Sequence, residues 1–244
     1  MKYISIIFLL VLTFPQEQLT SSYDLRESGI LTPVKHQMNL GACGVFAAVA
    51  VAEALIKEET GKTVDLSEQH VINMSDDWVP SGISSVDAMK FITEHGIVKE
   101  SELPYEDKKT SKKPGHVYDY KLKEYHSVVT AKMELADKVK TIKKAIMEYG
   151  PVATNMTFYK DLDAYTEGIY EWDGKATEEG GHWIVIVGWY EHFEIKNGGC
   201  WICRNSWGPN SPGSSPKLVT AVHCNRCALA GFFSRAAAKT GGRN

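Results

Sequence analysis

Cys43 stands at the start of a predicted helix, and this placement points to a nucleophilic thiol. The chain reads Gln37-Met-Asn-Leu-Gly41-Ala-Cys43, and the residues after Cys43 are apolar on all sides of a helix. Unpaired N–H groups and the positive end of the helix dipole favour an anion at a helix start. They therefore favour the thiolate, the reactive form of cysteine. Gln37 adds a neutral amide donor that suits a developing oxyanion.

A thiolate nucleophile needs a base beside it, and His182 is the best candidate among the eight histidines. It follows Gly180-Gly181 and opens the apolar segment Trp183-Ile-Val-Ile-Val187, which predicts a strand. Asn205-Ser206-Trp207-Gly208 ends the next apolar strand. The amide oxygen of Asn205 suits one imidazole nitrogen and leaves the other for sulfur, and Trp207 is expected to shield that bond from water. Alone, each motif also suits a structural histidine or an ordinary turn; together with Cys43 they favour catalysis.

The elements that must position these side chains follow from apolar spacing, caps and breakers. A buried central helix is expected at 43–59, closed by Gly61, and a short helix from the capping residues at 65–68 to about residue 74. Further helices are expected at 85–95 and 134–149, with a polar loop at 106–117. Strands are expected at 151–157, 182–190 and 200–205, with one more candidate at 217–223. Helices first and strands second predict an α+β chain with two lobes.

Composition narrows the functional classes. The 244 residues are 43% hydrophobic and carry a net charge of -3, which gives no electrostatic argument for nucleic acid or an anionic membrane. Residues 1–20 are predicted to be a signal peptide, because a lysine precedes a short apolar run and a polar stretch. The alternative is an N-terminal anchor helix. A leader indicates a secreted protein or one of the lysosomal or vacuolar lumen, and no membrane contact after its removal.

The five cysteines raise a separate question. Cys43 is far from the other four, so it is the natural odd thiol of an oxidising compartment. Cys200-x-x-Cys203 and Cys224-x-x-Cys227 approach a zinc-ribbon spacing. Residues 200 and 203 of one strand point to opposite faces, which weighs against a shared metal. Disulfides, buried free thiols and zinc remain the three alternatives, and no cofactor is expected.

In their order along the chain, these motifs resemble those of the papain family of cysteine peptidases. Gln37 and Gly41-Ala42-Cys43 match the oxyanion glutamine and the nucleophile, while Gly181-His182 and Asn205-Ser206-Trp207-Gly208 match the histidine and asparagine motifs. Supporting similarities are found at 23–26, 32–35, 66–69, 103–106, 150–152 and 168–170. The similar stretch covers roughly residues 23–208.

The resemblance implies a papain-like domain over residues 21–244, with an atypical segment at 209–244. A helical left lobe and a β-rich, barrel-like right lobe would enclose the active-site cleft. Cys43 and His182 would form a thiolate–imidazolium pair, Asn205 would orient His182, and Gln37 with the Cys43 N–H would bind the oxyanion. The reaction would be peptide hydrolysis through an acyl-enzyme, with endopeptidase action. Implied partners are peptide or protein substrates and proteinaceous cysteine-protease inhibitors, and a monomer is expected. Substrate contacts are expected at Ser81, Gly82, Gly181, Trp183 and Trp207.

Some positions depart from the family pattern. Gly44 replaces a tryptophan, which is expected to remove a wall and loosen the helix start. Trp183 replaces a small residue and is expected to narrow a specificity pocket. Leu40 and Met74 stand where cysteines are common, so the left-lobe disulfides are expected to be absent. These departures support an alternative function, a catalytically weak homologue that binds peptides or proteins; a zinc-stabilised interaction module is a more distant one.

Overall fold

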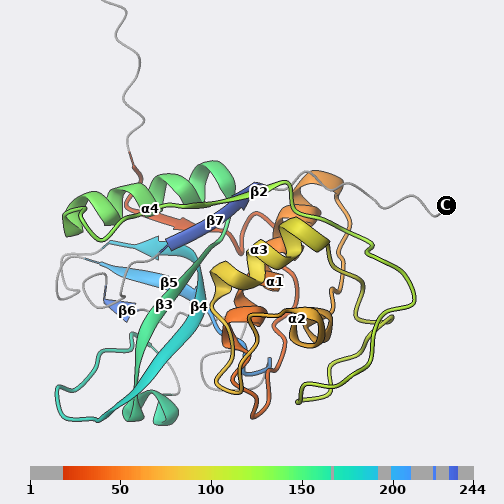
Figure 1. The fold of residues 1–244 in the computed structure, drawn as a ribbon. Helices are drawn as coiled ribbons and strands as arrows, with labels where there is room; N and C mark the ends of the chain where they lie inside the picture. Colours follow the sequence, from red (N-terminus) through yellow and green to blue (C-terminus); the bar gives the residue numbers. More distant parts are fainter. Residues whose placement is uncertain (1–18, 166–167, 192–198, 210–221, 224–230, 236–244) are drawn as a thin grey trace, which may run out of the picture.

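A computed structural model describes residues 19–165, 168–191, 199–209, 222–223 and 231–235. Three helices gather on one side of the molecule, and a sheet covered by a fourth helix occupies the other (Figure 1). The predicted α+β class is therefore confirmed. The predicted signal peptide lies almost wholly outside the described residues, as does most of the atypical segment at 209–244.

The central helix α1 (Cys43–Thr60) is buried on all sides from Gly44 to Ile56. It packs against α3 (Ser85–His95) on one side and the sheet on the other, which explains why it is apolar all round. It ends at Gly61, whose φ of 70° is the left-handed conformation that glycine adopts without strain. The helix that begins at Cys43 is thus held rigidly by its own burial.

The two shorter helices of this half begin at serine caps. The Ser67 hydroxyl accepts the His70 N–H at 3.0 Å and starts α2 (Glu68–Met74). The Ser84 hydroxyl accepts the Asp87 N–H at 3.1 Å and starts α3. Among the described residues, no helix is both long and apolar enough to cross a membrane.

The sheet carries the other half of the molecule. Its order is β2-β7-β3-β4-β5-β6, with β1 also pairing with β4, and every pairing is antiparallel. The long strand β4 lies between β3 and β5 and packs against α1. The strands are β1 (Ser22–Asp24), β2 (Glu124–Ser127), β3 (Val152–Tyr159), β4 (Glu178–Tyr190), β5 (Cys200–Arg204), β6 (Val222–His223) and β7 (Gly231–Arg235).

Helix α4 (Leu135–Tyr149) is amphipathic, packs on the sheet and ends at Gly150-Pro151 as expected. A short 3-10 helix, η1 (Lys160–Ala164), follows β3. The sequence patterns predicted α4 and the strands β3, β4 and β5 to within a few residues. They did not predict β1, β2 or β7, and of the candidate strand at 217–223 only β6 lies within the described residues.

A largely buried ion cluster surrounds the Lys35 ammonium beside α1 and α2. Lys35 Nζ lies 2.8 Å from Glu53, 3.1 Å from Glu68 and 2.7 Å from Asp65. Burial lowers the pKa of Lys35, but the carboxylates of Glu68 and Glu53 outweigh it and raise that pKa. Burial raises the pKa of Glu68 well above its usual range, although Lys35 opposes this. Lys35 is thus a main counter-charge for the buried Glu53 and Glu68, and the Arg204 guanidinium also acts on both.

Lys35→Met should therefore destabilise the fold by about 3–5 kcal/mol, because it leaves buried carboxylates without this counter-charge. The loss should be larger at pH 9 than at pH 6, because burial raises the pKa of Glu68 to about 8, so this carboxyl is charged at the higher pH and protonated at the lower one. Denaturant unfolding at pH 9 and pH 6 measures it. The matched control is Lys160→Met, which breaks an exposed pair with Asp163 and should barely change the stability. Equal effects of the two substitutions would contradict the prediction.

His70 is a second buried titratable group on the helical side. Its Nδ1 accepts the Val98 N–H at 3.3 Å, and its ring meets Phe91 edge-on. Burial lowers the pKa of His70 to about 4, and the nearby His116 and His95 act in the same direction. The folded protein therefore holds this imidazole neutral, whereas the unfolded chain takes up its proton at a higher pH.

The contribution of His70 to stability should be complete above pH 6.5 and should be lost as the pH falls from 6.5 towards 4. A lowered histidine pKa of this size corresponds to about 3 kcal/mol. His70→Gln retains an acceptor for the Val98 N–H but does not titrate. Its free energy of unfolding should consequently decline less between pH 6.5 and pH 4 than that of the wild type. Parallel declines in both proteins would show that His70 does not dominate this range.

Candidate active site

The structure brings His182 and Asn205 together as predicted. His182 Nε2 and Asn205 Oδ1 lie 2.8 Å apart, and both side chains are buried. His182 comes from β4, and Asn205 directly follows the neighbouring strand β5. The same Asn205 oxygen accepts the Ser206 N–H at 2.8 Å, which fixes the orientation of the amide. Since Nε2 is engaged by Asn205, Nδ1 is the ring nitrogen that remains for a thiol.

Two aromatic rings cover this pair. The Trp207 ring lies over the imidazole of His182, with ring centroids 5.2 Å apart at an angle of 32°. Phe158 of β3 contacts both rings, with centroids 6.0 Å from His182 and 6.1 Å from Trp207. A hydrogen bond shielded from water in this way is stronger than an exposed one. The expected shielding by Trp207 is therefore present, and Phe158 extends it.

Cys43 is the first residue of α1, and its sulfur faces the strand that carries His182. The backbone N–H groups of Trp183, Gly44 and Cys43 itself act on the thiol and favour its ionised form. Because Trp183 directly follows His182, its N–H places the sulfur against the His182 end of β4. The structure thus brings Cys43 and the segment around His182 together across the two halves of the molecule.

Burial modifies the expected ionisation of these groups. It raises the pKa of the Cys43 thiol by more than the surrounding N–H groups lower it. It also lowers the pKa of His182, although the hydrogen bond to Asn205 Oδ1 opposes the change. Each group alone is therefore discouraged from carrying a charge. A thiolate and an imidazolium are favoured here only when they form together, since each then compensates the other.

Gln37 lies beside this group and is held at both ends of its amide. Ser206 Oγ donates to Gln37 Oε1 at 2.6 Å, and Gln37 Nε2 donates to the Leu40 carbonyl at 3.0 Å. The Gln37 N–H also donates to the Ser206 carbonyl at 2.8 Å. An amide nitrogen carries two hydrogens, so one donor of Nε2 remains for a ligand. Its placement agrees with the predicted oxyanion donor, which stays a proposal.

Ser81 and Gly82 lie directly against the loop that precedes Cys43. A Cβ atom on Gly82, whose φ is 90°, would come within 1.8 Å of the Gly41 carbonyl oxygen. Gly44 meets the next residues of the same segment, since a Cβ there would lie 2.1 Å from the Ile83 carbonyl oxygen. We expected an open wall and a loose helix start at Gly44. The backbone of 83–85 fills that space instead, so Gly44 is a close-packing position.

The remaining predicted contact residues lie along β4. Trp183 is half-buried and pairs in register with Asn155 of β3. It lines a small cavity between the halves together with Phe46 and Ala47 of α1. Gly181 lies against the Asn155 side chain, where a Cβ would be 3.1 Å from the amide nitrogen. Trp183 thus lines the space between α1 and the sheet, and the expectation that it narrows a specificity pocket stays a prediction.

Several residues around the site were not singled out from the sequence. Ser206 and Phe158 contact Gln37 and His182, and Tyr105 donates its hydroxyl to the Gln37 carbonyl at 2.6 Å. Ser206 was visible as the neighbour of Asn205. Phe158 carried no local signal, and Tyr105 belongs to the family-like stretch 103–106 but had no role assigned to it, because both residues reach the site from distant parts of the chain.

Two of the other four cysteines, Cys200 and Cys203, lie buried in β5, and burial raises the pKa of Cys200. Cys224 and Cys227 lie outside the described residues. The disulfide, free-thiol and zinc alternatives for the four cysteines therefore stay open.

Comparisons with known proteins agree with this arrangement. A family model described as papain family cysteine protease matches residues 19–227. Procathepsin L of Rattus norvegicus is 29% identical over 219 residues, covering 87% of this chain and 64% of the relative. Cathepsin S of Bos taurus is 28% identical over 227 residues, covering 90% of this chain and 66% of the relative. The chain thus spans just under two thirds of the length of these relatives.

Solved structures show the same fold. The recombinant stem bromelain precursor superposes with a TM-score of 0.71 at 23% identity, covering 89% of this chain and 71% of that chain. Bromelain from Ananas comosus, solved with an inhibitor, gives a TM-score of 0.69 at 22% identity and is covered completely. Fold and site together define an α+β protein with a thiol opposite an imidazole–amide pair. With the match over 19–227, the chain belongs to the papain family of cysteine proteases.

Asn205→Ala should lower the pKa of His182 further, because it removes the hydrogen bond that favours the charged ring. NMR titration of labelled histidine side chains measures that pKa directly. Asn155→Ala is the matched control, since Asn155 lies in the same sheet and contacts Gly181 without bonding the imidazole. A His182 pKa that does not change in Asn205→Ala would show that the contact has no electrostatic effect.

Proposed function

We propose that the protein is a cysteine peptidase that uses Cys43 as its nucleophile and His182 as the general base and acid. The observation that carries this proposal is the buried bond between His182 Nε2 and Asn205 Oδ1 at 2.8 Å, beside a thiol at the start of α1. A bond to Nε2 leaves Nδ1 towards the sulfur. A protein that only binds peptides has no chemical need for these groups in this order.

In the proposed reaction, the proton of Cys43 passes to His182 Nδ1 and the sulfur attacks the peptide carbonyl carbon. The carbon–oxygen π electrons move to oxygen, and Gln37 Nε2 and the Cys43 N–H stabilise that charge. When the oxyanion collapses, the carbon–nitrogen bond breaks and His182 gives its proton to the departing amine. An acyl-enzyme remains, with the acyl group on sulfur.

A water molecule then completes the cycle. His182 takes a proton from that water as its oxygen attacks the thioester, and the same oxyanion donors act again. The carbon–sulfur bond breaks, and sulfur recovers its proton from the imidazolium. Asn205 keeps the ring in one orientation through both steps, and Trp207 limits the access of water to the bond that holds it. Endopeptidase action and a lysosomal or secreted location are the finer parts of this proposal.

The proposal predicts that a peptide-like epoxide alkylates Cys43 in the folded, leader-free protein. Intact mass should show one adduct, formed faster at neutral pH than with free cysteine, because the imidazole accepts the thiol proton. Peptide hydrolysis should fall by at least about 10³-fold in Cys43→Ala. Cys200→Ala removes a buried cysteine of the same sheet and should retain both adduct and activity.

An adduct that survives in Cys43→Ala would place the reactive thiol elsewhere. A folded protein that forms no adduct and cleaves no peptide would overturn the proposal and favour a protein that only binds at this site. Both outcomes are read from the same samples, with circular dichroism as the check on folding.

A further inference from the structure

The segment between Gln37 and Cys43 must hold the oxyanion donors, yet it is an exposed loop. Met38 has a φ of 53° and is 53% exposed. The chain has no cysteine before Cys43 and none between Cys43 and Cys200, so no disulfide ties this loop to the helical half. Something other than a covalent link must therefore fix its shape.

The Asp107 carboxylate supplies that fixation. Its Oδ1 accepts the backbone N–H groups of Leu40 at 2.9 Å and Asn39 at 3.1 Å. Its Oδ2 lies 3.5 Å from the Asn39 side-chain amide. Asp107 has a φ of 53°, a conformation that aspartate tolerates better than most residues. Hydrogen bonds from N–H groups to a carboxylate are stronger than those between neutral groups.

The loop passes this constraint directly to Gln37. The Leu40 carbonyl accepts both Gln37 Nε2 at 3.0 Å and the Ala42 N–H at 2.6 Å. Asp107 therefore binds the N–H of Leu40, and the carbonyl of Leu40 in turn orients the amide of Gln37. Tyr105, two residues before Asp107, holds the Gln37 carbonyl at 2.6 Å. The segment 105–107 thus fixes both ends of the loop.

We propose that Asp107 is a positioning residue for the oxyanion donors, acting through Leu40 on Gln37. This inference rests on the proposed peptidase function. It predicts that Asp107 matters only for reactions in which negative charge develops on an oxygen at the site. Peptide hydrolysis is such a reaction. Alkylation by iodoacetamide is not, because a sulfur–carbon bond forms, the carbon–iodine bond breaks and iodide leaves.

The test compares both reactions in Asp107→Gly, since glycine tolerates the positive φ and only the carboxylate is lost. We expect kcat for a peptide substrate to fall about 10-fold with KM within about twofold, because a displaced donor weakens transition-state stabilisation alone. The rate of iodoacetamide alkylation of Cys43 should stay within about twofold. Asp107→Asn keeps an acceptor oxygen without the charge and should retain most of kcat.

Two further variants complete the experiment. Asp173→Gly is the matched control, because Asp173 Oδ1 accepts the N–H groups of Lys175 and Ala176 in a loop of the other half and should not affect kcat. In a Gln37→Ala background, Asp107→Gly should cost less than about threefold, since the group it positions is gone. A full, additive loss in that background would overturn the inference, as would equal losses in hydrolysis and alkylation.

The two proposals fail in distinguishable ways. If the wild-type protein neither cleaves peptides nor reacts at Cys43, the peptidase function itself fails. If the wild type does both and Asp107→Gly matches it in kcat, only the role of Asp107 fails.

Discussion

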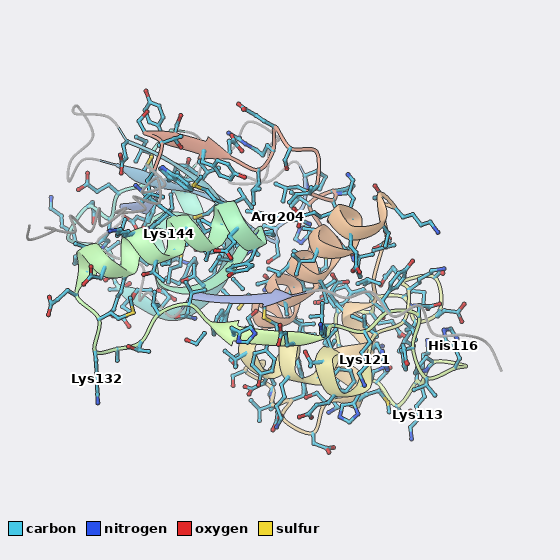
Figure 2. All side chains as sticks on the ribbon, turned by 90° about the horizontal axis from the view of Figure 1, so that it is seen from above. Lys113, His116, Lys121, Lys132, Lys144 and Arg204 are labelled. Carbon is cyan, nitrogen blue, oxygen red and sulfur yellow. The ribbon has the colours of Figure 1, made fainter. Side chains whose placement is uncertain are left out.

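The structure depends on how the carboxylate of Glu53 is held at the interface of the two halves. Glu53 is fully buried in α1, and its oxygens accept the Thr32 hydroxyl at 2.6 Å and the Leu66 N–H at 2.9 Å and pair with Lys35. Arg204 binds the segment that contains Thr32, because its guanidinium donates hydrogen bonds to the Thr32 and Pro33 carbonyls at 2.9 and 2.7 Å. Figure 2 shows Arg204 between α1 and the sheet half. The residue after Arg204 is Asn205, so one polar network links the helix of Cys43 to the amide that orients His182.

This buried polar network costs desolvation free energy, but it fixes how the two halves are positioned. Buried ion networks gain little net stability over well-packed apolar groups, because each charge must be removed from water. Directional contacts do, however, fix the relative position of elements in a way that apolar packing alone does not. A thiol and an imidazole that are charged only together need such fixed positions, since a small displacement would return both to their neutral forms. The polar network and the aromatic rings over His182 thus serve the same purpose, which is to fix the imidazole relative to the thiol.

Much of this could be predicted from the sequence, and the reason differs from one element to the next. Helices α1, α3 and α4 have strong local signals in their apolar spacing and terminal glycines, and α3 also begins at a serine cap. Strands β1 and β2 are short, and each pairs with a strand far along the chain, so no local pattern reveals them.

The same division applies to the site. Cys43, His182 and Asn205 are unusual in their immediate surroundings, and this identifies them from the sequence. Asp107 is an ordinary residue of a polar loop, and Tyr105 lies in the family-like stretch 103–106 just before it. Their importance lies in contacts made 67 and 68 positions away along the chain. Gly44 illustrates an error of the opposite kind. A residue without a side chain predicts open space, but the backbone of a distant segment occupies that space.

The contact between Gly41 and Gly82 has a consequence for how this protein can vary. Two stretches of main chain touch there with no side chain between them, and a Cβ on Gly82 would lie 1.8 Å from a carbonyl oxygen. Side chains adapt to their neighbours by changing rotamer, but a backbone contact offers no such freedom. Sequence change at this contact is therefore confined to events that move both loops at once.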